Sequence, residues 1–209
     1  MELDPDKIRV NPPETNIAVV QNRYFNKVFR PELGLFYGRI MDEAYTETTY
    51  LGYRLSMFFT EGLGIEISSS NSFIEDSPDK KALDQLKYPD PEALDEYPSK
   101  QVQPTPEINR VMGAFDVSLF FTPLYGKVNV LDSFIIYSDL SLTAGYSLLQ
   151  TEQGNLNAFT YGVGQKLYFT KSLSFRWDLR MKRYEETRLE EPVAKNAYYM
   201  DFGLCYFLF

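Results

Sequence analysis

The C-terminal stretch of the chain, 198–209, constrains the fold more than any other part of the sequence. Every second residue in it, from Tyr198 to Leu208, is apolar or aromatic, whereas the positions between them begin small or polar, as at Asp201 and Gly203. A period of two residues is the pattern of a β-strand in which one face meets lipid or a hydrophobic core. The chain is therefore predicted to end in a two-faced strand.

The order of residues in this strand resembles the closing-strand signal of outer-membrane β-barrels, in which a polar residue, a glycine and two hydrophobic residues stand at fixed places. Those places are filled by Asp201, Gly203, Tyr206 and Leu208, and Phe209 follows as the last residue. The alternative is a core strand of a soluble sheet that happens to be C-terminal. The resemblance implies a strand that outer-membrane lipid surrounds and that barrel-insertion machinery recognises.

Seven further segments share this alternation, and each is about as long as a strand that crosses a membrane. With the closing strand, they cover about 29–40, 49–60, 62–72, 111–122, 134–148, 157–169, 173–183 and 198–209. Their apolar faces carry Leu55, Phe121, Leu142 and Trp177, while glycines and charged residues gather on the opposite faces. A soluble barrel would turn the apolar face inward. We therefore predict an all-β fold, an eight-stranded antiparallel transmembrane β-barrel in the outer membrane of a Gram-negative cell envelope.

The charged residues of the opposite faces are predicted to point into the lumen and to pair with one another. They are Arg54, Glu66, Asp116, Asp139, Lys166, Arg176, Asp178, Arg180 and Asp201, with Lys182 on the same face of its strand as Arg176. Buried charges must be paired, so a structural role is the simplest interpretation, and a proton or ion path or catalysis are the alternatives. With Phe58 and Tyr168 as further filling, an eight-stranded lumen leaves no room for a diffusive pore.

Composition narrows the function classes. The chain has 16 Tyr, 16 Phe and a single Trp, yet its mean hydropathy is only −0.31, as expected for outward apolar and inward polar positions. It has no run of about 18 apolar residues, so no transmembrane helix is expected. The net charge of −8 disfavours nucleic acid as a partner. The first residues lack the features of a signal peptide, so we expect the numbering to begin at a mature or recombinant start.

The chain contains no histidine and one cysteine, Cys205, which we expect to be a small lumenal residue. Most known barrel enzymes of the outer membrane use a histidine as general base, so we predict that the chain is not an enzyme. Thiolate metal clusters and His-ligated zinc or haem sites are closed to it as well. We therefore predict no catalytic residue, no cofactor and no metal.

The predicted connections alternate between two lengths. Short turns follow the second and sixth strands, and a connection of moderate length, TPLYGKVNVLD from Thr122, follows the fourth; Tyr125-Gly126-Lys127 within it is predicted to be a periplasmic turn or, alternatively, a partner contact. The longer loops are 41–48, 73–110, 149–156 and 184–197. Short turns on one side and long loops on the other indicate periplasm and exterior, and an even number of strands places both termini on the periplasmic side.

Two regions lie outside the strand pattern. The arm 1–28 is rich in proline and charge and is predicted to be periplasmic, either a loose leader or a segment that docks on the barrel 29–209 or on a partner. The external loop 73–110 is acidic and contains half of the 12 prolines. We expect short helical turns within 79–86 and 91–94 and a cap over the outer mouth. A mobile solvated loop and an outward contact surface are the alternatives.

Several motifs together resemble a family of small outer-membrane β-barrel proteins of myxobacteria and predatory delta-type bacteria. They are AVVQNRYF at 18–25, RPELGL at 30–35, TPLYGK at 122–127, YSDLSLTAGYS at 137–147, YGVGQKLYF at 161–169 and FRWDLR at 175–180. The loop 73–110 and the terminal Leu208-Phe209 depart from that family. The resemblance implies an outer-membrane barrel without enzyme activity, and some relatives look like parts of trans-envelope machines such as those of gliding motility.

Three hypotheses for the function follow. The first is a scaffold barrel that anchors or partners a larger cell-envelope assembly. The second is a narrow channel or small-solute binder. The third is an adhesion or recognition barrel that presents the loop 73–110 outside the cell.

Overall fold

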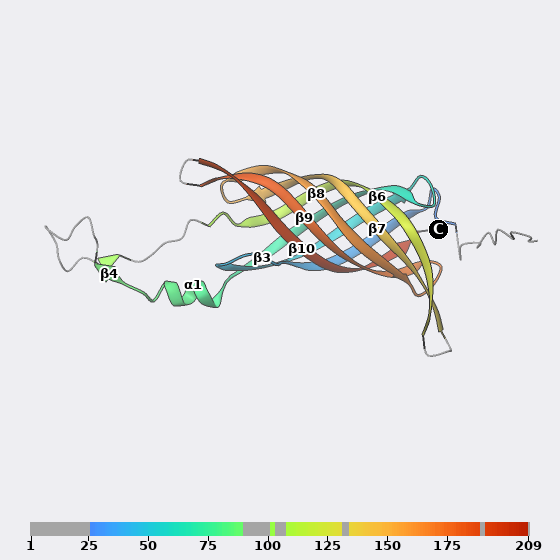
Figure 1. Ribbon diagram of the computed structural model, residues 1–209, viewed down its shortest axis with the longest axis horizontal. Coiled ribbons are helices and arrows are strands. Elements are labelled where there is room, and N and C mark those ends of the chain that lie inside the picture. Colours follow the sequence, from blue (N-terminus) through green and yellow to red (C-terminus); the bar gives the residue numbers. More distant parts are fainter. Residues whose placement is uncertain (1–25, 90–100, 103–107, 131–133, 189–190, 209) are drawn as a thin grey trace, which may run out of the picture.

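The computed structural model describes residues 26–89, 101–102, 108–130, 134–188 and 191–208, and the chain forms a closed antiparallel barrel of eight strands (Figure 1). The strands are β1 (Pro31–Ile40), β2 (Thr46–Phe58), β3 (Leu63–Asp76), β6 (Val111–Val130), β7 (Phe134–Thr151), β8 (Gly154–Tyr168), β9 (Leu173–Arg188) and β10 (Glu191–Phe207). Each strand pairs with its neighbours in the chain, and β1 closes the barrel against β10. The predicted fold class is confirmed.

The two faces of the strands are distributed as the alternation predicts. The side chains of Leu55, Phe121 and Leu142 are 46%, 50% and 46% exposed, so they point outward, and Trp177 is half-buried on the same outer face. Inward positions are buried where the strands form the wall of the barrel; in β1 every second residue from Glu32 to Ile40 is buried. No helix among the described residues is long and apolar enough to cross a membrane.

Two short turns close hairpins at the end of the barrel where β1 begins and β10 ends, and they are built alike. In the turn before β3, Thr60 Oγ1 accepts a hydrogen bond from the amide of Leu63 at 3.0 Å. In the turn before β9, Thr170 Oγ1 accepts one from the amide of Leu173 at 2.9 Å. A threonine hydroxyl that binds the backbone a few residues on favours a tight turn. Short turns lie on the periplasmic side of outer-membrane barrels, so we assign this end to the periplasm.

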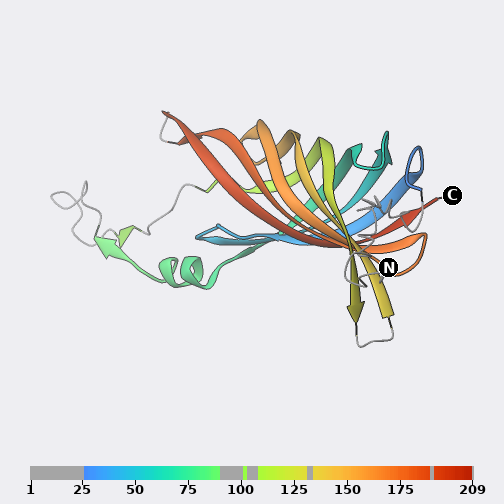
Figure 2. The same ribbon diagram turned by 45° about the vertical axis from the view of Figure 1, so that its right-hand side comes forward.

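The β6–β7 hairpin at the same end differs from the prediction. Tyr125-Gly126-Lys127 is not a turn, because it lies inside β6 and pairs with Tyr137–Asp139 of β7. The register shifts between Phe121 and Leu124, so Thr122 and Pro123 form a bulge. The proline interrupts the ladder locally but the bulge absorbs it, and pairing resumes beyond it. The hairpin therefore extends past the rim of the barrel (Figure 2).

At the outer end, the strands are longer than predicted. Most of 184–197, predicted as a loop, is strand, because β9 runs to Arg188 and β10 begins at Glu191. Likewise β7 runs to Thr151 and β8 begins at Gly154, whose φ of 125° favours glycine in the tight turn. These residues lie beyond the band of apolar side chains on the outer face, so apolar and polar residues no longer alternate there. Backbone pairing continues because it needs no apolar side chain.

The long external loop begins as an extension of β3. Ser77 caps the helix α1 (Pro78–Leu83), accepting a hydrogen bond from the amide of Lys80 at 3.2 Å, and a two-residue ladder joins β4 (Tyr88–Pro89) to β5 (Gln101–Val102). The predicted helical turn within 91–94 lies outside the described residues. The prediction of a cap is wrong for the described part, which projects beyond the strand ends and away from the mouth (Figures 1 and 2). Helix α1 buries none of its residues, so it has no apolar face to lay across the barrel.

Candidate functional site in the barrel lumen

The lumen of the barrel contains all nine charged side chains that the sequence places there, and each is buried. They are Arg54, Glu66, Asp116, Asp139, Lys166, Arg176, Asp178, Arg180 and Asp201. They come from β2, β3, β6, β7, β8, β9 and β10, so the charges reach the interior from nearly every side of the barrel. The period of two residues brings them there, because it turns every second side chain of a strand inward.

The centre of the lumen holds three arginines and three carboxylates. One half of this central cluster is built on Glu66 of β3. Its Oε2 accepts a hydrogen bond from Arg176 Nη1 at 2.5 Å, and its Oε1 accepts one from Arg180 Nη2 at 2.6 Å. Ser56 donates a further bond to Oε2 at 3.2 Å. Both oxygens of the carboxylate are thus bound by guanidinium groups of β9, which lies across the barrel from β3.

The other half of the central cluster is built on Asp178. Its Oδ2 accepts a hydrogen bond from Arg54 Nη1 at 2.6 Å, and its Oδ1 accepts one from Arg176 Nε at 3.0 Å. Arg180 Nη2 lies 3.5 Å from Oδ2. Arg54 also donates through Nη2 to Asp201 Oδ1. The cluster is neutral as a whole, which is what burial of six charges requires.

A smaller ion pair lies between the central cluster and the outer end. Lys182 Nζ donates to Asp116 Oδ1 at 2.5 Å. The hydroxyl of Ser147 donates to the same oxygen, and Ser68 Oγ donates to Oδ2 at 3.3 Å. Asp116 therefore has a cation and two hydroxyls as partners, and its charge is compensated within the wall of the barrel.

Two ion pairs lie toward the periplasmic end. Lys166 Nζ donates to both carboxylate oxygens of Glu32, each at 2.7 Å. Lys27 Nζ donates to Asp139 Oδ2, which also accepts a bond from the hydroxyl of Tyr168 at 2.6 Å. Lys27 belongs to the arm, yet its side chain is only 1% exposed, because it enters the mouth of the barrel. The end of the arm thus docks on the barrel, which was one of the two alternatives.

Aromatic side chains close the lumen on both sides of the ion pairs, one cluster at each end of the barrel. Phe58, Phe120, Tyr168 and Phe207 form a buried cluster at the periplasmic end, with the ring centroids of Phe58 and Phe120 4.7 Å apart. A larger buried cluster at the outer end is built around Phe36, Tyr50, Leu149, Tyr184 and Tyr199. A Cβ atom added to Gly38 would lie 2.4 Å from Tyr50 Cζ, so the packing there leaves no space for one.

The space that remains inside is too small for a solute. One lumenal cavity, between Tyr50, Arg180 and Tyr199, has a volume of about 20 Å³, and another, between Phe58, Asp139 and Lys166, has about 10 Å³. A cavity needs about 10–15 Å³ to hold a single water molecule. In the part of the chain that the structure describes, no group of three His, Cys, Asp or Glu side chains is arranged to hold a metal ion. The arrangement is a packed polar core.

Besides Glu186, which is buried on the inward face of β9, three partners in the lumenal ion pairs are missing from the predicted set of nine. They are Lys27, Glu32 and Lys182. Glu32 and Lys182 carry a signal in the sequence, since they stand at inward positions of their strands. Lys27 carries no such signal, because the arm has no alternation. The predicted set has five carboxylates and four cations. Lys27, Glu32 and Lys182 bring the ion-paired groups to six of each, and Glu186 is a seventh buried carboxylate.

The closing-strand residues lie as a lipid-facing strand requires. Tyr206 and Leu208 are exposed on the outer face, Asp201 is in the lumen, and Gly203 is a buried inward position paired with Phe36. Phe209 lies outside the described residues. Cys205 is free and buried in the lumen wall.

The outside of the barrel decides where the protein resides. Large apolar side chains are exposed around it on all eight strands, while paired charges fill the inside. In a closed antiparallel barrel, the backbone groups form their hydrogen bonds within the wall. The apolar side chains of the outer face then contact the lipid acyl chains, while the interior stays polar. The protein is an outer-membrane β-barrel, surrounded by lipid.

Comparison with known proteins gives a likeness of fold. No family model and no curated protein sequence matches the chain. Among solved structures, the chain is similar to the N-terminal β-barrel domain of OprF from Pseudomonas aeruginosa, with 13% identity, a TM-score of 0.44 and coverage of 86% of this chain and 97% of that one. It is also similar to Neisserial surface protein A, with 6% identity, a TM-score of 0.42 and coverage of 86% of this chain and 97% of that one. A third similar structure is Ail of Yersinia pestis, with 9% identity, a TM-score of 0.38 and coverage of 85% of this chain and 99% of that one.

Proposed function

We propose that this outer-membrane barrel is a scaffold that anchors or partners a larger assembly of the cell envelope. The observation that carries the proposal is the filled lumen. Six buried cations and their carboxylates are bound to one another, and aromatic clusters lie at both ends. Among the described residues, the cavities found in the lumen have room for about one water molecule each, which supports a role for the surfaces of the barrel.

The periplasmic end offers protein surface beyond the wall of the barrel. The β6–β7 hairpin extends past the rim, since β3 pairs with β6 only as far as Phe121 and β8 pairs with β7 only as far as Tyr137. The arm enters the mouth beside it, where Lys27 Nζ lies 5.9 Å from the centroid of the Tyr125 ring. Among the described residues, the strand edges of this hairpin pair with no further strand, and this edge together with the docked end of the arm favours a periplasmic partner. The motifs resemble a family of small outer-membrane barrels, and some relatives in that family look like parts of trans-envelope machines, which agrees with this proposal.

Crosslinking in the native envelope tests the scaffold. A photoactivatable residue at Lys127, exposed on the extended hairpin, is expected to give a discrete adduct with an envelope protein. The same residue at Leu86, exposed on the external loop, is the matched control and should give none. Adducts at Leu86 alone would contradict the periplasmic scaffold and favour the second candidate function below. In a planar bilayer, the barrel is expected to conduct no ions, and steady conductance would favour a channel.

The second candidate function is adhesion or recognition through the loop 73–110. It is favoured by the way the loop is fixed where it leaves the barrel. Asp76 Oδ1 accepts a bond from Arg110 Nη2 at 2.9 Å, Lys80 Nζ lies 2.8 Å from Asp76 Oδ2, and Ser77 Oγ donates to the carbonyl of Ala44 at 3.2 Å. These contacts hold both ends of the loop so that its body projects outward.

Deletion of the external loop separates the two functions. A variant in which a short turn replaces 76–106 is expected to keep a heat-modifiable barrel, since α1 buries no residue. Envelope crosslinks at Lys127 should persist in a scaffold. Attachment to surfaces or cells should be lost only in a recognition barrel. External protease should cleave the loop of the wild type in intact cells, and cleavage only after the outer membrane is breached would invert the topology.

A further inference from the structure

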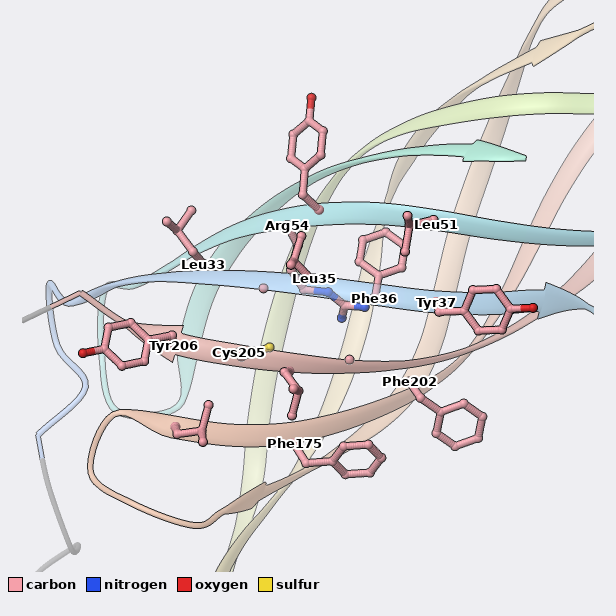
Figure 3. A pocket seen from close by; sticks show the side chains of 15 residues that line it. Leu33, Leu35, Phe36, Tyr37, Leu51, Arg54, Phe175, Phe202, Cys205 and Tyr206 are labelled. Atoms are coloured by element: carbon pink, nitrogen blue, oxygen red, sulfur yellow. The ribbon is translucent and has the colours of Figure 1, made fainter. Parts of the chain in front are cut away.

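A hollow of about 880 Å³ lies on the outer wall of the barrel, where the first and last strands meet (Figure 3). It is formed by β9, β10, β1 and β2, which are consecutive neighbours around the barrel. The central cluster lies on the opposite side of the same wall, with Arg54 directly behind the hollow. The hollow is therefore separate from the lumenal site and belongs to the membrane-facing surface.

The register across the four strands explains the hollow. Leu35 of β1 pairs with Leu204 of β10, and both line the hollow; we call this pair its floor. On the far side of Leu35 the paired residue is Tyr53, and on the far side of Leu204 it is Phe175. Two short side chains thus stand between two large aromatic rings in one row of paired residues across the four strands. Directly opposed side chains in a sheet lie close together, so this sequence of sizes forms a trough.

Aromatic rings also close the trough along the strand direction. Toward the periplasm, Tyr206 of β10 stands opposite Leu33. Toward the exterior, Tyr37 of β1 stands opposite Phe202. The rings of Phe175 and Phe202 are stacked, with centroids 6.3 Å apart, and make one wall continuous. Figure 3 shows Tyr206 and Tyr37 at opposite ends of the hollow with their hydroxyls turned away from it.

We propose that this hollow binds an acyl chain of a membrane lipid. The hollow is continuous with the apolar outer wall, which is the lipid interface of the barrel. No charged side chain is exposed in its lining, because Arg54 points into the lumen. The occupant is therefore hydrocarbon. Elsewhere on a convex wall an acyl chain touches protein on one side, whereas here it has a floor and walls.

Contact, rather than hydrophobicity, makes such a site selective. A lipid tail in the bilayer is already in an apolar solvent, so transfer to the hollow gains nothing from leaving water. The gain comes from dispersion contacts, which are small for each atom pair and add up where a concave wall surrounds the chain. A lipid held there exchanges more slowly than those on the convex wall. This binding site does not depend on the scaffold function.

The test is native mass spectrometry of the intact barrel after extraction from phosphatidylethanolamine bilayers with mild detergent. The wild type is expected to retain one phospholipid per chain. In the double variant Leu35→Trp, Leu204→Trp, two indoles fill the floor, and we expect the retained fraction to fall about tenfold. The matched control is Leu142→Trp, Val163→Trp, a cross-strand pair on the outer face of β7 and β8, which should retain the lipid as the wild type does.

A second variant guards against a folding failure of the first. Tyr53→Ala, Phe175→Ala removes two walls without adding bulk, and it should also lose the lipid while the barrel remains heat-modifiable. Equal retention by the wild type and both groove variants, or no retained lipid in the wild type, would overturn the proposal. A wild-type species of two chains without lipid, absent in the Trp-filled variant, would overturn it as well, by making the hollow an interface between two copies.

Discussion

The centre of the lumen and its periplasmic mouth both bury ion pairs, but different parts of the chain supply the partners. In the centre, Asp178 is bound by arginines that all belong to barrel strands, so closure of the barrel fixes them around it. At the mouth, Asp139 is bound by Lys27, which belongs to the arm. Lys27 can leave the lumen without opening a strand, whereas Arg54 cannot. Two equally buried ion pairs can therefore differ in how much of the barrel is destabilised when one partner is removed.

The largest effect is expected in the centre, from Asp178→Ala. The substitution leaves buried guanidinium groups without their shared carboxylate, and loss of one member of a buried ionic network costs about 3–5 kcal/mol. Urea unfolding of the barrel in lipid vesicles measures it. The control is Glu185→Ala, an exposed position on the same strand, which should unfold like the wild type. An unchanged urea midpoint for Asp178→Ala would show that the centre is not a packed ionic core.

The pair between Glu32 and Lys166 tests whether pairing or charge itself stabilises the lumen. Glu32→Gln and Lys166→Met are each expected to destabilise the barrel by about 3 kcal/mol, because each leaves one buried charge alone. The double variant removes both charges, so its loss should be smaller than the sum by about 0.5–3 kcal/mol. The measurement is a double-mutant cycle of urea unfolding. Strict additivity would mean that the two residues, 2.7 Å apart, stabilise the barrel independently.

At the mouth, Lys27→Ala is expected to have a smaller and more local effect. It removes one charged hydrogen bond, worth about 1.5–3 kcal/mol, and water can then reach Asp139 from the periplasm. Hydrogen exchange should become faster at the amide of Phe29, which donates to the carbonyl of Phe58 at 2.8 Å, while amides at the centre of β2 keep their protection. The control is Lys171→Ala, an exposed residue of the turn at the same end. Faster exchange throughout β2 would erase the contrast between centre and mouth.

The smallest effect is expected outside the lumen, at the base of the external loop. Hydrogen bonding to Lys80, with further help from Arg110, holds the pKa of Asp76 below its ordinary value. A lowered pKa in the folded state means that the contribution of the carboxylate is present above the unfolded pKa and is lost as pH falls through the folded one. Asp76→Asn should leave barrel unfolding unchanged but speed protease cleavage of the loop at neutral pH. An NMR titration of Asp76 checks the direction of the shift.

Alternation in the sequence was enough to predict the barrel and the face of each strand, because one backbone period assigns every side chain to lipid or to lumen. Leu55 and Trp177 were placed outside and Asp178 inside from this rule alone. The residues at which the strands begin and end were harder to predict from the sequence. Beyond the apolar belt the side chains no longer alternate, so the extended hairpins of β6–β7 and β9–β10 followed from backbone pairing that leaves little trace in the sequence.

What the sequence by itself determined is therefore the architecture, the membrane and the list of inward charges on the strands. Only the tertiary structure decided which charges meet: Glu66 and Arg176 are 110 residues apart in the chain, and Arg54 and Asp201 are 147 apart. Only the structure brought Lys27 of the arm to Asp139 and placed Leu35 beside Leu204. The physical reason is that closure of β1 against β10 sets the register between distant strands, and a local period carries no information on that register.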